Sequence, residues 1–524
     1  MKRRGFLAGG VAAMAAPLPM PAIAQAPKVL RMVPQANLTS LDPIWTTATV
    51  TRNHAFMIYD TLYGLDANLV PKPQMAAGHV VSDDGRRVVI TLRDGLLFHD
   101  GAKVLARDAT ASIKRWMVRN PFGQKLATVT DEVVALDDTR LEFRLRKAFP
   151  LLFAALGVVG SACFVMPERV ASTDPFKQLS DTTGSGPFRY LASEFNSGSF
   201  VGYARNERYV PRDEAVSFTA GGKRAFFDRV EWRIITDAAT SAAALQNNEI
   251  DWFEQPPPEL SDMLRRNRNI VIEPIDSKPN PAMLRLNHLH PPFDRKEARQ
   301  ALLPAIDQND FMSAIVGPDP KGYSTIGAFT PGTSLTTDQG MSALLGPRNL
   351  DRAKALLREA AALTPRMRLI GPTDILAPAA MTQVAGALFK DLGFNLDFAL
   401  SNWGTVIQRR ASREPVEKGG WSALLTAFGS FDWMDPAGHP VLRGNGKDAW
   451  FGWPQIPRLE ALRDDWFDAP DLAAQKMVAV DMQRVMLDEV PFIPVGAYYS
   501  NTALRRDLTG RVSGFALFYN LGRV

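Results

Sequence analysis

Residues 82–116 read SDDGRRVVITLRDGLLFHDGAKVLARDATASIKRW. The first half predicts a strand from Val88 to Arg93, because apolar and polar side chains alternate there between a DDG turn and a DG turn. A third turn, FHDG, leads into a segment whose apolar residues, ending with Trp116, have helical spacing. Asp108 lies where it can cap or charge the start of that helix. This order of elements predicts a mixed α/β chain.

The same kinds of element recur along the rest of the sequence. Residues 141–145 and 230–234 alternate between apolar and polar side chains, which predicts two further strands, each with one buried face. An Ala-rich helix is expected directly after Asp237, and the spacing of apolar residues predicts helices over 350–360 and 377–390. Strands and helices are therefore interspersed throughout, with no repeat of fixed period and no low-complexity tract.

Composition is that of a folded protein with more than one domain: 524 residues, 46% of them hydrophobic and 22% charged. Lys2, Arg3 and Arg4 lie in the leader described next, so the remaining 57 basic residues exceed the 55 acidic ones by two. Such an even balance argues against a nucleic-acid partner. The single cysteine, Cys163, excludes an intrachain disulfide and a Cys-based zinc site.

The first 26 residues have the features of an export signal: a basic head, an apolar stretch rich in Ala and Gly, and small residues at Ala22 and Ala24. We expect residues 1–24 to be a cleaved signal peptide, with Arg3-Arg4 resembling the twin-arginine pattern. The stretch is interrupted by prolines and is too short for a membrane anchor, and no cysteine lies near the cleavage point to carry a lipid. A periplasmic protein without a lipid anchor is expected.

Motifs for catalysis and for cofactors are not found. The sequence contains neither GxSxG, a P-loop, GxGxxG nor HExxH, so we expect no enzyme activity and no cofactor. His288 and His290 are the only histidines close in sequence, and on a strand they would share one face and could hold a metal. The alternative is that they pack at a strand end beside Pro291-Pro292. No acidic or thiolate ligand lies nearby, so no metal site is predicted.

The stretch 82–116 resembles the signature of the family 5 extracellular solute-binding proteins of ABC importers, the group of dipeptide, oligopeptide and nickel receptors. Further segments resemble that family in the family's own order. They are residues 38–73, 184–209 (beginning GSGPF), 229–251 (RVEWRIITDAATSAAALQNNEID), 291–307, 349–361 and 429–436 (GSFDWMDP). The resemblance covers essentially the whole chain after the leader, and several ordered motifs together are far more specific than any one of them.

This resemblance implies an α/β, class II periplasmic binding protein with two lobes, an inserted subdomain and a ligand cleft between the lobes. By analogy, lobe 1 is discontinuous and comprises residues 27–75, 184–275 and 495–524. The inserted subdomain spans 76–183, and lobe 2 spans 276–494. A ligand that touches both lobes would stabilise the closed form, which engages the permease.

The function implied is that of a periplasmic substrate-binding protein that captures di- or oligopeptides, or related amino-bearing solutes. Its expected partners are this ligand and the permease subunits of an ABC transporter at the inner membrane, and we expect a monomer. Because one fold serves several ligands, a receptor for a nickel chelate, an opine, a glycoside or haem is the alternative.

Asp432 is the strongest candidate for ligand binding, because dipeptide and oligopeptide receptors of the family bind the α-ammonium group of the peptide with an Asp at the matching place. The alternative is that Asp432 and the neighbouring Asp435 shape a turn before Pro436. Trp403 and Trp433 are expected to wall a side-chain pocket, with core packing as the alternative.

Trp45, Thr46 and Thr47 belong to the opening loop, which reaches the cleft in relatives but could also be a surface loop. Some dipeptide receptors hold the ligand carboxylate with an Arg in a loop that corresponds here to GPTDILAPAAM, residues 371–381, which contains no Arg. This departure argues against a fixed dipeptide length.

Three arginines, Arg409, Arg410 and Arg443, could supply a positive charge from elsewhere, although a solvated surface is the role expected for them. A longer peptide bound through its backbone also fits the sequence, as does a cationic ligand without a carboxylate.

Overall fold

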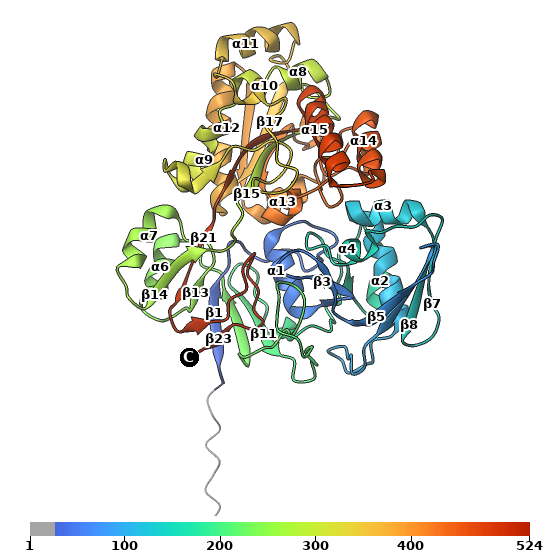
Figure 1. Ribbon diagram of the computed structural model, residues 1–524. Helices are drawn as coiled ribbons and strands as arrows, with labels where there is room; N and C mark the ends of the chain where they lie inside the picture. Colours follow the sequence, from blue (N-terminus) through green and yellow to red (C-terminus); the bar gives the residue numbers. More distant parts are fainter. Residues whose placement is uncertain (1–26) are drawn as a thin grey trace, which may run out of the picture.

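The computed structural model describes residues 27–524, so the predicted signal peptide lies outside the described residues. Three mixed layers of sheet and helix make up the molecule (Figure 1). The largest sheet has seven strands, in the spatial order β10 (Phe188–Tyr190), β11 (Phe200–Arg205), β12 (Arg229–Arg233), β1 (Val29–Val33), β13 (Trp252–Phe253), β21 (Asn501–Arg505) and β14 (Ile270–Pro274). We call the part built on it the first lobe. Its helices are α1 (Thr49–Ile58), α6 (Ala238–Gln246) and α7 (Pro258–Arg265).

The second lobe is built on a six-stranded sheet. Its strands, in spatial order, are β16 (Tyr323–Ser324), β20 (Phe492–Tyr498), β15 (Asn280–Leu286), β19 (Ala423–Ala427), β17 (Arg366–Pro372) and β18 (Asn395–Ser401). Its helices are α8 (Lys296–Gln300), α9 (Gln308–Val316), α10 (Ser342–Leu345), α11 (Leu350–Glu359), α12 (Leu376–Leu392), α13 (Trp403–Arg409), α14 (Pro457–Asp468) and α15 (Leu472–Glu489). The chain passes between the two large sheets from β14 to β15 and from β20 to β21, so two short connections join the lobes.

The third part, which we call the insert, has a four-stranded antiparallel sheet in the order β5 (Ala76–Val81), β6 (Arg87–Leu92), β8 (Arg140–Leu145) and β7 (Thr130–Ala135). It carries the helices α2 (Ala106–Arg119), α3 (Pro121–Val129), α4 (Leu152–Leu156) and α5 (Glu168–Ala171). The short pair β2 (Asp60–Thr61) and β9 (Phe164–Val165) joins the insert to the chain that follows α1.

Most of the predicted elements are confirmed. The strand predicted from Val88 is β6, and the helix after it is α2, where the Asp108 side chain accepts the backbone N–H of Leu105 at 2.8 Å. Trp116 on α2 is fully buried, as its helical spacing predicts. Asp237 caps α6 by accepting the backbone N–H of Thr240 at 2.7 Å.

The alternation in β8 is confirmed on its apolar face and wrong at Glu142. This residue was expected on the solvent face, yet it is 0% exposed. The guanidinium groups of Arg87 and Arg144 cover its carboxylate, with Nε to oxygen distances of 2.8 Å each. Neighbouring long side chains, rather than the core, bury this residue.

The sheets bear on one domain limit. The predicted boundary between residues 494 and 495 falls inside β20, which pairs along its length with β15 of the second lobe. The chain therefore leaves the second lobe only after Tyr498. The other limits stay a prediction.

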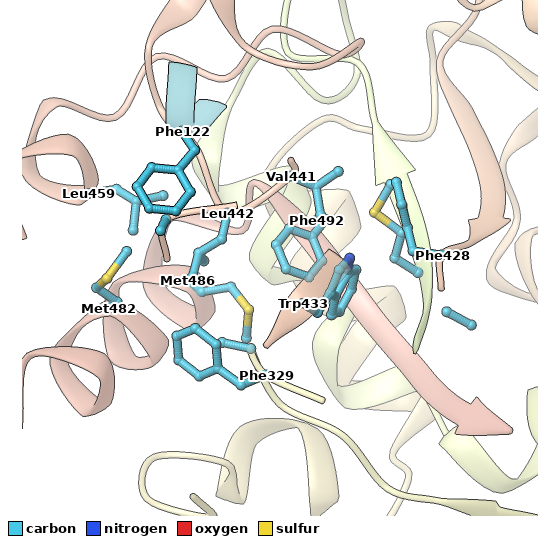
Figure 2. Close-up of a cluster of buried hydrophobic side chains, with 14 of the residues drawn as sticks. Phe122, Phe329, Phe428, Trp433, Val441, Leu442, Leu459, Met482, Met486 and Phe492 are labelled. Carbon is cyan, nitrogen blue, oxygen red and sulfur yellow. The ribbon is translucent and has the colours of Figure 1, made fainter. Parts of the chain in front are cut away.

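A hydrophobic cluster runs from the second lobe into the insert (Figure 2). Trp433 and Phe492 pack near its centre, and Phe122 of α3 lies beside Leu459 of α14 and near Met482 of α15. None of the helices in residues 27–524 is both long and apolar enough to cross a membrane. The three parts are thus held in contact by packing, which brings residues far apart in the sequence to a shared site.

Candidate ligand site between the lobes

A cavity of about 330 Å³ lies where the first lobe, the insert and the second lobe meet. The loop 43–47 and Arg52 line it from the first lobe, and residues 118–124 and 160–162 line it from the insert. The second lobe contributes side chains between 428 and 453. A smaller cavity of about 60 Å³ adjoins it, and Thr47, Arg52 and Phe428 line both. The structure therefore brings Trp45, Thr47 and Asp432 to one cavity, as the sequence predicts.

Asp432 lies in the single-turn 3₁₀ helix η5 (Ser430–Trp433). Its Oδ2 accepts the backbone N–H of Gly429 at 2.9 Å, and the Nη1 of Arg52 lies 3.6 Å from the same oxygen. Burial raises the pKa of this carboxyl, and the Arg52 charge opposes that shift. The residue thus closes its own turn while its carboxylate lines the cavity, which combines the two roles considered for it.

The other carboxylate oxygen of Asp432 faces the insert. A Cβ atom on Gly160 would lie 2.3 Å from Oδ1, so only glycine allows the insert to approach this closely. No donor within residues 27–524 forms a hydrogen bond with Oδ1. Asp432 therefore retains a free acceptor in the cavity, at the junction of three parts of the chain.

Trp433 does not wall the cavity, which corrects the prediction for it. Its side chain is 0% exposed and packs against Phe428, His439 and Phe492, at ring distances of 6.0, 4.8 and 4.9 Å (Figure 2). Successive side chains of a 3₁₀ helix point about 120° apart, so Asp432 can face the cavity only if Trp433 points elsewhere. The core alternative holds for Trp433.

Asp435 holds the turn after η5. Its Oδ1 accepts the backbone N–H groups of Ala437 and Gly438 at 2.9 and 3.3 Å, and burial raises the pKa of its carboxyl. It does not line either cavity. This is the structural role that was the alternative for both aspartates.

The opening loop is a contact between the lobes rather than a free surface. Thr47 Oγ1 accepts the indole N–H of Trp450 at 3.4 Å, and Thr46 Oγ1 accepts the Nη2 of Arg410 at 3.1 Å. Trp403 lines the smaller cavity with one edge and packs into the core with the rest, being 6% exposed. Both readings of Trp403 apply.

The solvated role expected for two of the arginines is wrong. Arg410 and Arg443 are only 2% and 5% exposed. Arg443 pairs with Glu460, with its Nε 3.0 Å from Oε1, whereas the guanidinium of Arg410 stacks on aromatic rings. Arg409, the neighbour of Arg410, is half-buried and lines neither cavity.

Several lining residues have no counterpart in the sequence predictions: Arg52, Arg119, Trp450, Phe451 and Trp453. Arg52 had a signal that could have found it, because it is the one charged residue among ten in the buried helix α1. An ionised side chain in such a helix requires a partner. The others lie in loops or at a helix end, where no periodicity marks them.

The two histidines considered for metal binding do not share a strand face. Strand β15 ends at Leu286, so His288 and His290 lie in the turn beyond it. His290 Nε2 lies 2.8 Å from the carbonyl of Arg413, and burial holds the pKa of His288 well below its usual value. Within residues 27–524 no three His, Cys, Asp or Glu side chains are grouped as metal ligands would be.

Comparison with known proteins gives consistent matches. Residues 70–449 match the family model described as bacterial extracellular solute-binding proteins, family 5 middle. A probable peptide ABC transporter periplasmic-binding protein of Sinorhizobium fredii is 34% identical over 521 residues, which cover 98% of this chain and 97% of the relative.

Solved structures show the same fold. A Pseudoalteromonas dipeptide-binding protein in complex with Met-Leu is 20% identical with a TM-score of 0.75, over 95% of this chain and 100% of the other. The Bacillus subtilis oligopeptide-binding protein in complex with a nonapeptide is 16% identical with a TM-score of 0.78, over 95% and 100%.

A periplasmic binding protein of A. tumefaciens R10 in complex with agropinic acid is 18% identical with a TM-score of 0.77, over 95% of this chain and 99% of the other. The fold is that of a class II periplasmic binding protein, with two lobes and a cleft between them. Matched over most of its length, the chain belongs to family 5 of the bacterial extracellular solute-binding proteins, which is a family of transport receptors and not of enzymes.

Proposed function

We propose that this protein is the periplasmic receptor of an ABC importer, and that it captures peptides or related amino-bearing solutes in the cavity between its lobes. The observation that carries this proposal is the Asp432 carboxylate, which is buried at the junction of three parts of the chain with Oδ1 free to accept. The S. fredii relative, named as a probable peptide receptor, supports it over nearly the full length.

The Asp432 carboxylate suits a ligand ammonium group. Arg52 lies 3.6 Å away, beyond ordinary hydrogen-bond distance, so it steadies the charge without occupying Oδ1. An ammonium group at this oxygen forms a charge-assisted hydrogen bond in a site with little water. A neutral solute offers no such bond, and the buried carboxylate then disfavours it.

Closure of the lobes converts binding into a signal for transport. The cavity has walls from both lobes and the insert, so a ligand in it contacts all three and stabilises the closed arrangement. The closed, loaded receptor is the form that delivers its solute to the permease subunits. The protein acts as a monomer in the periplasm after removal of residues 1–24.

Calorimetric titration with Ala-Phe and N-acetyl-Ala-Phe tests the amine requirement. We expect the free amine to bind about 10- to 100-fold more tightly, since a charge-assisted hydrogen bond contributes about 1.5–3 kcal/mol. The isosteric variant Asp432→Asn should remove the difference, and Asp448→Asn, an exposed carboxylate on the rim of the same cavity, should keep it. Equal binding of both peptides by the wild type would contradict the proposal.

Native mass spectrometry of the protein purified without denaturation tests the ligand class directly. A captured mass that resolves into peptides supports the proposal. A nickel, opine, sugar or haem mass would refute the peptide assignment and leave the receptor role in place.

A further inference from the structure

Two arginines at the cleft have no carboxylate partner within residues 27–524. Arg119, at the C-terminal end of α2, donates from Nη2 to the carbonyl of Trp45 at 3.3 Å. Arg410, directly after α13, donates from Nη2 to the hydroxyl of Thr46 at 3.1 Å. Neither of these bonds neutralises a guanidinium charge.

Arg410 is the more deeply buried of the two. Its guanidinium lies over the rings of Trp403, Trp450 and Phe451, at 5.8, 5.2 and 4.8 Å, and its Nε has no hydrogen-bond partner. Aromatic faces attract a cation without supplying a counter-charge. The site is therefore built to hold the Arg410 side chain in place and leaves its positive charge uncompensated.

The two charges come together from different parts of the molecule. Arg119 belongs to the insert, Arg410 to the second lobe, and both donate to the opening loop of the first lobe. Burial, together with the nearby charge of Arg119, lowers the pKa of Arg410 to about 9. Closure of the lobes thus brings two like charges out of water, which is unfavourable unless an anion accompanies them.

Other arginines around the cleft show that this lack of a partner is specific. Arg115, one turn before Arg119 on α2, pairs with Asp42, with Nη2 2.6 Å from Oδ2. Arg443 pairs with Glu460 in the wall of the same cavity. Arg119 lines the larger cavity and Arg410 the smaller one, and Thr47 of the opening loop lines both.

We propose that Arg119 and Arg410 form a carboxylate-binding subsite, so that the captured solute carries a free carboxylate as well as an amine. The inference rests on the proposed function for the amine and adds a second requirement. A carboxylate between two guanidinium groups accepts charge-assisted hydrogen bonds from both, and it joins the insert to the second lobe. This assigns to Arg119 and Arg410 the carboxylate contact that residues 371–381, without an Arg, cannot make.

Calorimetry with Ala-Phe and its C-terminal amide Ala-Phe-NH₂ separates this subsite from the amine contact, because both peptides keep the free amine. We expect the wild type to bind the acid at least 10-fold more tightly than the amide. Arg119→Gln and Arg410→Gln should each lower acid binding toward the amide level. Arg409→Gln, a half-buried neighbour outside both cavities, is the matched control and should keep the preference.

A peptide-free measurement keeps the inference testable on its own. Trp450 and Trp403 flank Arg410, so tryptophan fluorescence during an acetate titration at constant ionic strength reports an anion there. We expect a saturable change in the wild type that is lost in Arg119→Gln, a half-buried position that folding tolerates better than 410.

The outcomes distinguish the two proposals. Equal binding of acid and amide, with the Asp432 dependence intact, overturns the carboxylate subsite and leaves the proposed function. An acetate response with no binding of any free-amine peptide overturns the proposed function and supports the subsite. No saturable acetate response in the wild type overturns the subsite in either case.

Discussion

Replacement of Phe467 by Ala should weaken ligand binding although this residue lies outside both cavities. Phe467 belongs to α14 of the second lobe, and its ring meets those of Phe122 and Phe149 of the insert at 5.8 and 5.9 Å. Lys125 of the insert lies 5.0 Å over the same ring. These contacts form only when the insert and the second lobe are together, so they contribute to closure.

The size of the effect follows from the contact. Phe467 is half-buried, and losing roughly 80 Å² of its buried apolar surface costs about 2 kcal/mol at ~25 cal/mol per Å². Because this cost falls on the closed form, the ligand must offset it, and the apparent affinity should fall about 30-fold. The residues that touch the ligand are unchanged.

Calorimetric titration with the captured ligand, together with small-angle scattering of the free and loaded protein, measures this effect. Phe398→Ala is the matched control, because Phe398 is half-buried on β18 and packs over Gly386 within the second lobe. It should reduce stability and leave the affinity unchanged. An affinity in Phe467→Ala equal to that of the wild type, or a loss no larger than in the control, would refute the reasoning.

Three further predictions concern stability. Asp42→Asn breaks a fully buried ion pair with Arg115 and should lower the free energy of unfolding in urea by about 3–5 kcal/mol. Trp433→Ala removes a buried core side chain and should cost about 3–5 kcal/mol in the same assay, with the order of preference among ligands unchanged in calorimetry. Burial raises the pKa of Glu254 from 4.5 to about 7, so its contribution to stability is complete below pH 4.5 and is lost as the pH rises through 7. Glu254→Gln should therefore flatten the decline in urea stability between pH 4.5 and 8, by about 3 kcal/mol; an unchanged pH profile would contradict the buried acid.

Local elements were predictable because alternation and helical spacing record which face of a segment is buried. The strand from Val88, the helix with Trp116 and the cap at Asp237 all follow from neighbours a few positions away. Where burial comes from something other than a core, the pattern fails. Glu142 is covered by two arginine side chains, which no alternation rule describes.

The candidate site was predictable only in part, and through resemblance more than through periodicity. Asp432, Trp45 and Thr47 meet at the cavity as the family resemblance implies. Trp433 failed because adjacent residues of a short 3₁₀ turn face different directions, and the sequence does not state which of them faces the cleft.

The arginines show most clearly why sequence reasoning stops at the cleft. Thr46 and Arg410 are 364 positions apart, and their hydrogen bond exists only because two lobes meet. An Arg at a helix end is ordinarily solvated, so position in the chain favours the exposed role for Arg410. Its burial is a property of the closed arrangement and therefore of the function.

Two sets of contacts now act on closure with opposite signs. Packing around Phe467 and the ion pair between Lys125 and Asp464 favour the closed form whether or not a solute is present. The approach of Arg119 and Arg410 opposes it until an anion is enclosed. A receptor with only the first set would close empty and could engage the permease without cargo. With both, closure is favourable when the solute supplies the missing negative charge, so the arginines make the closed state depend on the cargo as well as contributing to its affinity.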